Sequence, residues 1–124
     1  MFKRDPNSLF NKYVQSFGYA FSGIKKVFLA ERNFRFHTLA AILVVSLGFI
    51  LHITITEWLF VVLATGIVIT AEALNTAIEK LVDMVSPEKN TNAGWIKDVA
   101  AGAVLLASIC AFVIGLLVFV PYLV

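Results

Sequence analysis

The sequence predicts an all-α membrane protein with three transmembrane helices and an amphipathic helix before them. Of its 124 residues, 60% are apolar and only 15% are charged, whereas soluble domains are about 45–50% apolar and about 25% charged. A soluble domain of this size has too little interior to bury so much apolar surface. Residues 99–124 also contain no Asp, Glu, Lys or Arg, and such a run is long enough to cross a hydrocarbon core. We therefore expect residues 1–124 to form one integral-membrane domain.

The helix expected at about residues 7–30 is amphipathic. Aromatic residues such as Phe10, Tyr13 and Phe17 recur at roughly helical spacing, with polar residues such as Lys12 between them. This pattern is typical of a surface helix that lies in the headgroup region, where its lysines reach anionic lipid. The alternative is a cytosolic helix packed against the transmembrane bundle.

Three apolar stretches predict the transmembrane helices, at about residues 34–52, 57–85 and 95–121. Helices are expected because backbone groups in lipid must find their hydrogen-bond partners within the chain. Residues 86–94 are polar and contain proline and glycine, so we expect them to form a loop between the second and third spans.

Lysine and arginine residues are segregated along the chain. Seven of them precede or begin the first span, and Lys80, Lys89 and Lys97 flank the connection after the second span. The other connection and the C-terminus carry none. Because basic residues stay on the cytoplasmic side, we expect a multi-pass protein of the cytoplasmic (inner) membrane with its N-terminus inside and its C-terminus outside. The net charge of +2 gives no indication of nucleic-acid binding.

The second span carries an unusual stripe of polar residues. Glu72, Asn75, Glu79 and Asp83 are spaced by three, four and four residues, so they share one face of a helix. Glu72 lies about 21 Å along this helix from Trp58, on the cytoplasmic side of the bilayer centre. A carboxylate inside a span is costly unless it faces water, a cation or a partner. A stripe of oxygen atoms suits hard cations.

Residues that flank the other spans are expected at the same level. Glu31 precedes the first span. Lys97 and Asp98 begin the third, where the dipole of the first helical turn favours an anion such as Asp98. With the stripe, these residues predict one polar layer that binds Mg²⁺ and a polyphosphate. The sequence has no Gly-rich phosphate loop, so a nucleotide site must be built in another way.

Other interpretations of these polar residues stay open at this point. Taken singly, Glu79 and Asp83 fit solvated helix ends, and Asp98 fits a helix cap. Glu72 and Asn75 lie inside an apolar span, so they fit either a functional site or a structural polar cluster. They could also line the water path of a non-enzymatic small membrane subunit or channel.

Several segments resemble one known family. Residues 72–83, with the sequence EALNTAIEKLVD, resemble the signature of the small prokaryotic diacylglycerol kinase/undecaprenol kinase family. Residues 17–23 and 31–35 resemble its N-terminal region, and residues 97–105 resemble its third-helix motif. The resemblance implies a homotrimer with active sites shared between subunits. It also implies that ATP with Mg²⁺ phosphorylates the hydroxyl of a membrane lipid at the cytoplasmic face.

The resemblance also implies roles for individual residues. Glu72 matches the general base, and Glu31 and Glu79 match the residues that hold Mg²⁺. Lys97 and Asp98 match residues that contact the nucleotide. The other positions that the family uses around ATP are Lys12, Tyr19, Asn75, Glu88, Lys89 and Asn90. The positions along its lipid-binding segment are Asn33, Phe34, Arg35, Phe36 and His37, which act together with Glu72.

The Gram-positive branch of the family resembles this chain in residues 86–89 and near the C-terminus, in residues 114–121. That branch is associated with undecaprenol, the polyprenyl carrier of cell-wall synthesis. The resemblance therefore implies an undecaprenol kinase that recycles this carrier, with a diacylglycerol kinase that makes phosphatidic acid as the alternative.

Overall fold

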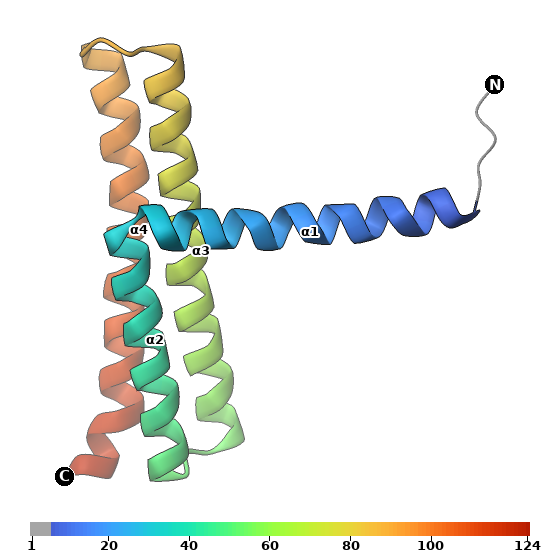
Figure 1. The fold of residues 1–124 in the computed structure, drawn as a ribbon. Coiled ribbons are helices and arrows are strands. Elements are labelled where there is room, and N and C mark those ends of the chain that lie inside the picture. Colours follow the sequence, from blue (N-terminus) through green and yellow to red (C-terminus); the bar gives the residue numbers. More distant parts are fainter. Residues whose placement is uncertain (1–5) are drawn as a thin grey trace.

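The computed structural model describes residues 6–124, with side chains from residue 8 onward, and consists of four α-helices. They are α1 (Pro6–Ala30), α2 (Arg32–Leu51), α3 (Ile55–Val85) and α4 (Thr91–Leu123). Helices α2, α3 and α4 lie alongside one another as a bundle, while α1 runs crosswise and extends away from it (Figure 1). The predicted all-α architecture is confirmed. Of the basic N-terminal residues, Lys3 and Arg4 lie outside the described part of the chain.

Three of these helices are long and apolar enough to cross a membrane, as predicted. Helix α2 has 20 residues, or about 30 Å, which matches the thickness of a hydrocarbon core. Helices α3 and α4 have 31 and 33 residues, or about 46 and 50 Å. They therefore exceed the thickness of the core by about half.

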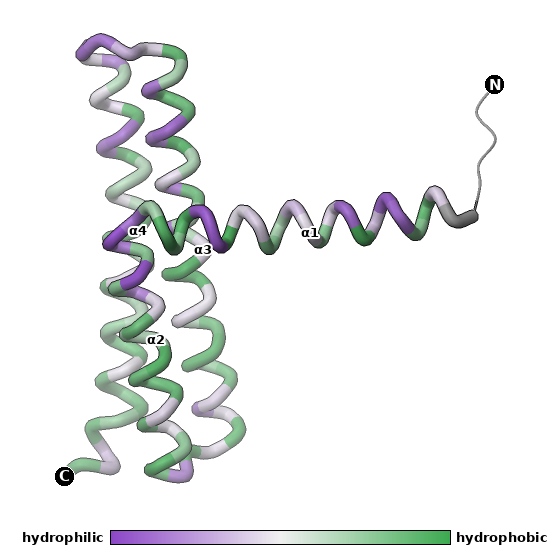
Figure 2. The backbone as a smooth tube through the Cα atoms, viewed as in Figure 1, coloured by the Kyte–Doolittle hydropathy of each residue, from purple (hydrophilic) through white to green (hydrophobic). Residues whose placement is uncertain are grey.

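The excess length of α3 and α4 lies at the end where the chain connects them. In Figure 1 this end extends well past the level at which α1 meets α2. We call residues 80–97 the projecting hairpin. Figure 2 shows that hydrophilic residues gather there, whereas the part of the bundle beside α2 is largely hydrophobic. The boundary between the two parts coincides with the level of α1.

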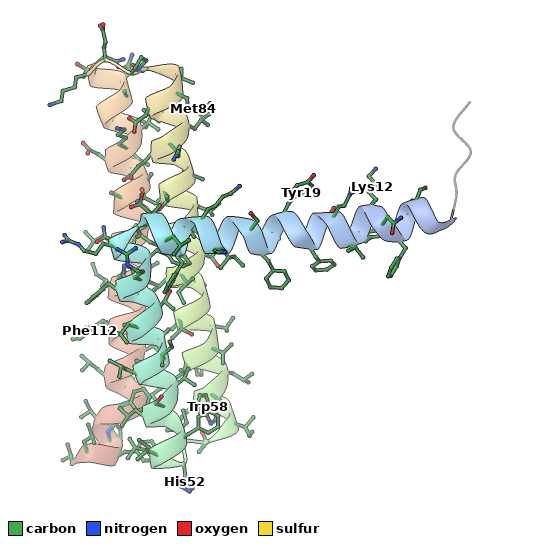
Figure 3. All side chains as sticks on the ribbon, in the orientation of Figure 1. Lys12, Tyr19, His52, Trp58, Met84 and Phe112 are labelled. Atoms are coloured by element: carbon green, nitrogen blue, oxygen red, sulfur yellow. The ribbon has the colours of Figure 1, made fainter. Side chains whose placement is uncertain are left out.

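Helix α1 does not pack along the bundle. Its side chains are exposed from Ser8 to Phe21, so this part of α1 is not packed against the bundle of its own chain. The side chains of Lys12 and Tyr19 extend from the edge of α1 that faces the level of the projecting hairpin, and aromatic rings extend from the opposite edge (Figure 3). This division suits a helix lying at a membrane surface, with its aromatic face toward the lipid.

The sharp turn between α1 and α2 has a local cause. Glu31 alone separates the two helices and adopts an extended backbone conformation. The guanidinium of Arg35 reaches back from α2, and its Nη1 donates to the carbonyl oxygens of Phe28 at 2.9 Å and Leu29 at 3.0 Å. These carbonyls belong to the last turn of α1, where they have no helical partner. Arg35 thus closes the end of α1 and fixes the position of Glu31.

Helix α4 begins earlier than expected. The side chain of Asn90 accepts a hydrogen bond from the backbone N–H of Ala93 at 2.8 Å and caps the helix. The expected loop over residues 86–94 is therefore wrong in its second half, and Gly94 lies inside the helix. The cap supplies a partner for one of the free N–H groups of the first turn, which outweighs the low helix propensity of glycine.

The opposite end of the bundle is closed by side chains. A cluster of buried residues, Ile53, Val61, Val118 and Phe119, joins the α2–α3 turn to α3 and the end of α4. Thr54 and Glu57 form a reciprocal capping box at the start of α3. This end supplies the packed core that holds the three helices in register.

Candidate active site

The polar stripe on α3 faces the interior of the structure at two positions. Among the described side chains, the buried polar or charged ones are Glu72 and Asn75, which are 4% and 8% exposed. Asn75 Nδ2 donates to Glu79 Oε1 at 3.4 Å. Asn75 Oδ1 is buried and has no hydrogen-bond partner within residues 8–124. A buried acceptor without a donor costs about 1–3 kcal/mol, so this atom fits a donor supplied by a ligand or a second subunit.

Two further carboxylates lie within electrostatic range of Glu72. They are Glu31, at the α1–α2 turn, and Glu79, about two turns further along α3. Like charges held together in a partly buried site favour a bound cation. The predicted grouping of Glu31, Glu72 and Glu79 at one site stays a prediction.

Glu31 and Glu79 also line the same groove. It has a volume of about 1250 Å³ and lies between the end of α1, the start of α2 and α3. Lys26, Lys80 and Asp83 add further charges to its lining. No group of three or more Asp, Glu, His or Cys residues in the described chain is arranged to hold a metal ion by itself. Mg²⁺ commonly takes only one or two carboxylates and completes its shell with water and phosphate oxygens, so the two carboxylates fit it.

Glu72 has one further ionisable neighbour. Nε2 of His37, on α2, lies 3.9 Å from Oε2 of Glu72. This distance is longer than a direct hydrogen bond. The sequence analysis predicts His37 only as a residue of the lipid-binding segment. Spacing along the sequence does not indicate that it lies beside Glu72 of another helix.

The polar residues expected in one layer lie at two levels along the bundle. Lys97 Nζ binds Asp83 Oδ1 at 2.5 Å, and Asp83 lies about 16 Å along α3 from Glu72. The pair belongs to the projecting hairpin, while Glu72 lies near the level of α1. The expected place of Asp98 in the first turn of its helix is also wrong, because α4 begins at Thr91. Asp98 is exposed beyond that turn.

Several expected nucleotide-site residues lie far from Glu72 in the same chain. Tyr19 and Lys12 are about 18 and 28 Å along α1 from Glu31, and both are exposed. The remaining ones, Glu88, Lys89 and Asn90, are exposed at the tip of the projecting hairpin. One protomer therefore does not bring the whole expected nucleotide site together.

The expected lipid-binding segment begins α2. Phe34 is buried and is 4% exposed, whereas Asn33 and Phe36 are exposed and His37 is half-buried. Arg35 holds the end of α1, as described above. The segment thus lies directly beside Glu31 and Glu72, at the level where α1 leaves the bundle.

Together the fold and the site define a class of protein: a three-span membrane bundle with acidic groups gathered where a surface helix meets it. Residues 18–119 match the family model described as prokaryotic diacylglycerol kinase. The chain belongs to the prokaryotic diacylglycerol kinase family. It is therefore a membrane kinase, and the alternative of a non-enzymatic subunit or channel is wrong. Membership of a kinase family also implies the use of ATP.

Individual relatives carry two different names. The chain is 39% identical over 123 residues to the undecaprenol kinase of Bacillus subtilis (strain 168), covering 99% of this chain and 100% of that protein. It is 40% identical over 101 residues to the diacylglycerol kinase of Synechocystis sp., covering 81% of this chain and 58% of that protein. It is 29% identical over 104 residues to the diacylglycerol kinase of Escherichia coli (strain K12), covering 84% and 85%.

Proposed function

We propose that this chain is an undecaprenol kinase, which transfers the γ-phosphate of ATP to the hydroxyl of undecaprenol. The observation that carries the chemistry is the buried carboxylate of Glu72 at the level of α1, because a lipid alcohol presents its hydroxyl at that level while its tail stays in the hydrocarbon. The similarity to the Bacillus subtilis undecaprenol kinase over the full chain supports the substrate. Diacylglycerol is the second candidate, supported by the names of the other two relatives.

The proposed reaction uses Glu72 as the general base. Its carboxylate accepts the proton of the lipid hydroxyl while the hydroxyl oxygen forms a bond to the γ-phosphorus. The bond from that phosphorus to the oxygen it shares with the β-phosphate breaks, and ADP leaves. Phosphoryl transfer depends mainly on positioning and on neutralising the charge of the phosphates, which is the task of the groups around Glu72.

Glu31 and Glu79 would hold Mg²⁺. Their carboxylates line one groove from two different elements, and the site has room for phosphate oxygens to complete the shell. When bound, Mg²⁺ neutralises charge on the β- and γ-phosphates. The amide of Asn75 holds Glu79 by its Nδ2 and keeps Oδ1 available for a donor in the assembled site.

We propose that the active site is shared within a homotrimer. Lys12 and Tyr19 are carried away from their own bundle by α1 (Figure 3), so the site that they could serve is that of a neighbouring subunit. Lys97 and residues 88–90 would contact the nucleotide from the projecting hairpin, and Asp98 would contact it from the position directly after the hairpin. In this arrangement Lys12 and Tyr19 reach an active site, which they do not reach within their own protomer.

The proposed orientation follows from the same geometry. The projecting hairpin and α1 would face the cytoplasm, where ATP is available, and the α2–α3 turn and the C-terminus would face the outside of the cytoplasmic membrane. Residues 1–124 act as one membrane domain in this arrangement. The distribution of Lys and Arg supports it.

A substrate panel tests the function. Purified protein in lipid nanodiscs would receive radiolabelled ATP with Mg²⁺ and either undecaprenol or diacylglycerol at equal mole fraction. We expect faster labelling of undecaprenol. Faster labelling of diacylglycerol would favour the second candidate, and labelling of neither lipid would overturn the proposal.

A further inference from the structure

Glu72 has a partner on α2 that the proposed chemistry has not yet used. His37 Nε2 lies 3.9 Å from Glu72 Oε2, and the two side chains are 20% and 5% exposed. A carboxylate this buried interacts strongly with the nearest polar group, because little water screens it. The other histidine, His52, lies at the far end of α2 (Figure 3), so it has no access to this site.

The imidazole of His37 has aromatic neighbours on its own helix. The Phe36 ring contacts the His37 ring edge-on, with centroids 5.7 Å apart and planes at 76°. Phe34 anchors the same turn of α2 in the interior, at 4% exposure. Nε2 of this imidazole is the ring atom that lies 3.9 Å from Glu72 Oε2.

Building on the proposed function, we infer that His37 is a positioning residue, which donates from Nε2–H to Oε2 of Glu72 and leaves Oε1 for the proton of the lipid hydroxyl. A general base is commonly oriented by a third group in this way. Contacts of this kind are often long in structures without substrate and shorten when the reactants bind. The role requires a hydrogen on Nε2 of the imidazole.

A rival role for His37 comes from its other neighbours. The residue also lines an apolar cavity of about 410 Å³ between α2, α3 and α4, together with Phe36, Val68 and Phe112. If the imidazole served only to contact the lipid tail there, its loss would weaken lipid binding and leave the chemical step intact. The two roles therefore predict different kinetic changes.

The test compares two substitutions with a control. His37→Phe keeps a ring in the cavity but removes the donor, whereas His37→Gln places an amide N–H near the position of Nε2. We expect His37→Phe to lower kcat about 10- to 100-fold, the loss expected for one hydrogen bond to a charged group, with KM for the lipid changed less than about twofold. His37→Gln should recover most of kcat. His52→Asn, which tolerates the left-handed backbone at that position (φ 55°), should leave both constants unchanged.

Coupling to Glu72 gives a second kinetic readout. In a Glu72→Gln background, adding His37→Phe should lower the residual rate no further, because residues that act as a unit are not additive. An unchanged kcat in His37→Phe, a rise in KM alone, equal loss in the Phe and Gln variants, or multiplicative losses in the double variant would each overturn the inference.

A spectroscopic readout keeps this inference separate from the proposed function. In protein with ¹⁵N-labelled histidine, Glu72→Gln should shift the Nε2 resonance of His37 and leave that of His52 in place. An unmoved Nε2 resonance would overturn the pairing even in an active kinase. Wild-type protein that phosphorylates neither lipid would instead overturn the function, and the His37–Glu72 contact would still be measured by this shift.

Discussion

The hydroxyl of Tyr122 donates a 2.6 Å hydrogen bond to Oε1 of Glu57, although 65 residues separate them. The same oxygen accepts from the hydroxyl of Thr54 at 2.9 Å. One carboxylate therefore starts α3 and also ties the last turn of α4 to it. This contact closes the end of the bundle opposite the candidate active site, and stability and activity can be tested separately at the two ends.

Removing the Tyr122 hydroxyl should lower stability without changing activity. Tyr122→Phe loses the hydrogen bond to Glu57 and keeps the ring, so we expect the thermal unfolding midpoint in detergent to fall by a few degrees. Tyr13→Phe, which removes a hydroxyl from an exposed part of α1, is the matched control. Equal midpoints for the two variants would mean that the contact does not stabilise the bundle.

Gly48 is expected to accept no larger residue. A Cβ atom added there would lie 2.7 Å from Cη2 of Trp58 and 3.1 Å from Cδ1 of Ile53. We therefore expect Gly48→Ala to destabilise the protein by about 1–3 kcal/mol, the usual cost of overpacking, in reversible unfolding measurements. Gly18→Ala, where nothing lies within 4 Å of the added atom, should be neutral or stabilising. The reverse order would contradict the close packing of α2 on Trp58.

Glu72→Gln should remove turnover and keep assembly. The amide cannot accept the proton, so kcat should fall about 10²- to 10⁴-fold, while elution from a sizing column stays as in the wild type. Glu57→Gln is a suitable control, because glutamine also serves at this position of a capping box. A near-normal rate for Glu72→Gln would refute the assignment of the base.

Mixed assemblies test whether the active site is shared. Lys12→Ala and Glu72→Gln should each be nearly inactive alone. When the two variants are refolded together, some sites combine an intact α1 from one subunit with an intact Glu72 from another, so activity should return. Activity that stays at the level of the separate variants would show that Lys12 and Glu72 serve independent functions or the same subunit.

The fold could be predicted from the sequence because the membrane imposes simple requirements. An uncharged run such as residues 99–124 has no alternative to a spanning helix. The periodic aromatic residues of α1 likewise predict a surface helix. The start of α4 was harder to predict, because the proline and glycine near it favour a loop, whereas a single side-chain cap at Asn90 decides the boundary.

The candidate site was predictable only along single helices. The spacing of Glu72, Asn75 and Glu79 fixes their common face, and this prediction needs no tertiary information. The contact between His37 and Glu72 depends on how α2 is rotated against α3, which spacing within either helix does not determine. Lys97 is separated from Glu72 because it pairs with Asp83, which lies about 16 Å along α3 from Glu72. That pairing joins α4 to α3, so spacing within one helix does not determine it.

The overhang of α3 and α4 beyond α2 has a kinetic consequence. In the proposed orientation, ATP would arrive from the water above the projecting hairpin, and the lipid alcohol would arrive by lateral diffusion in the leaflet. Neither has to leave before the other can enter. Separate routes of this kind predict random-order kinetics. ADP would then leave into the water, and the phosphorylated lipid would leave by diffusion within the membrane.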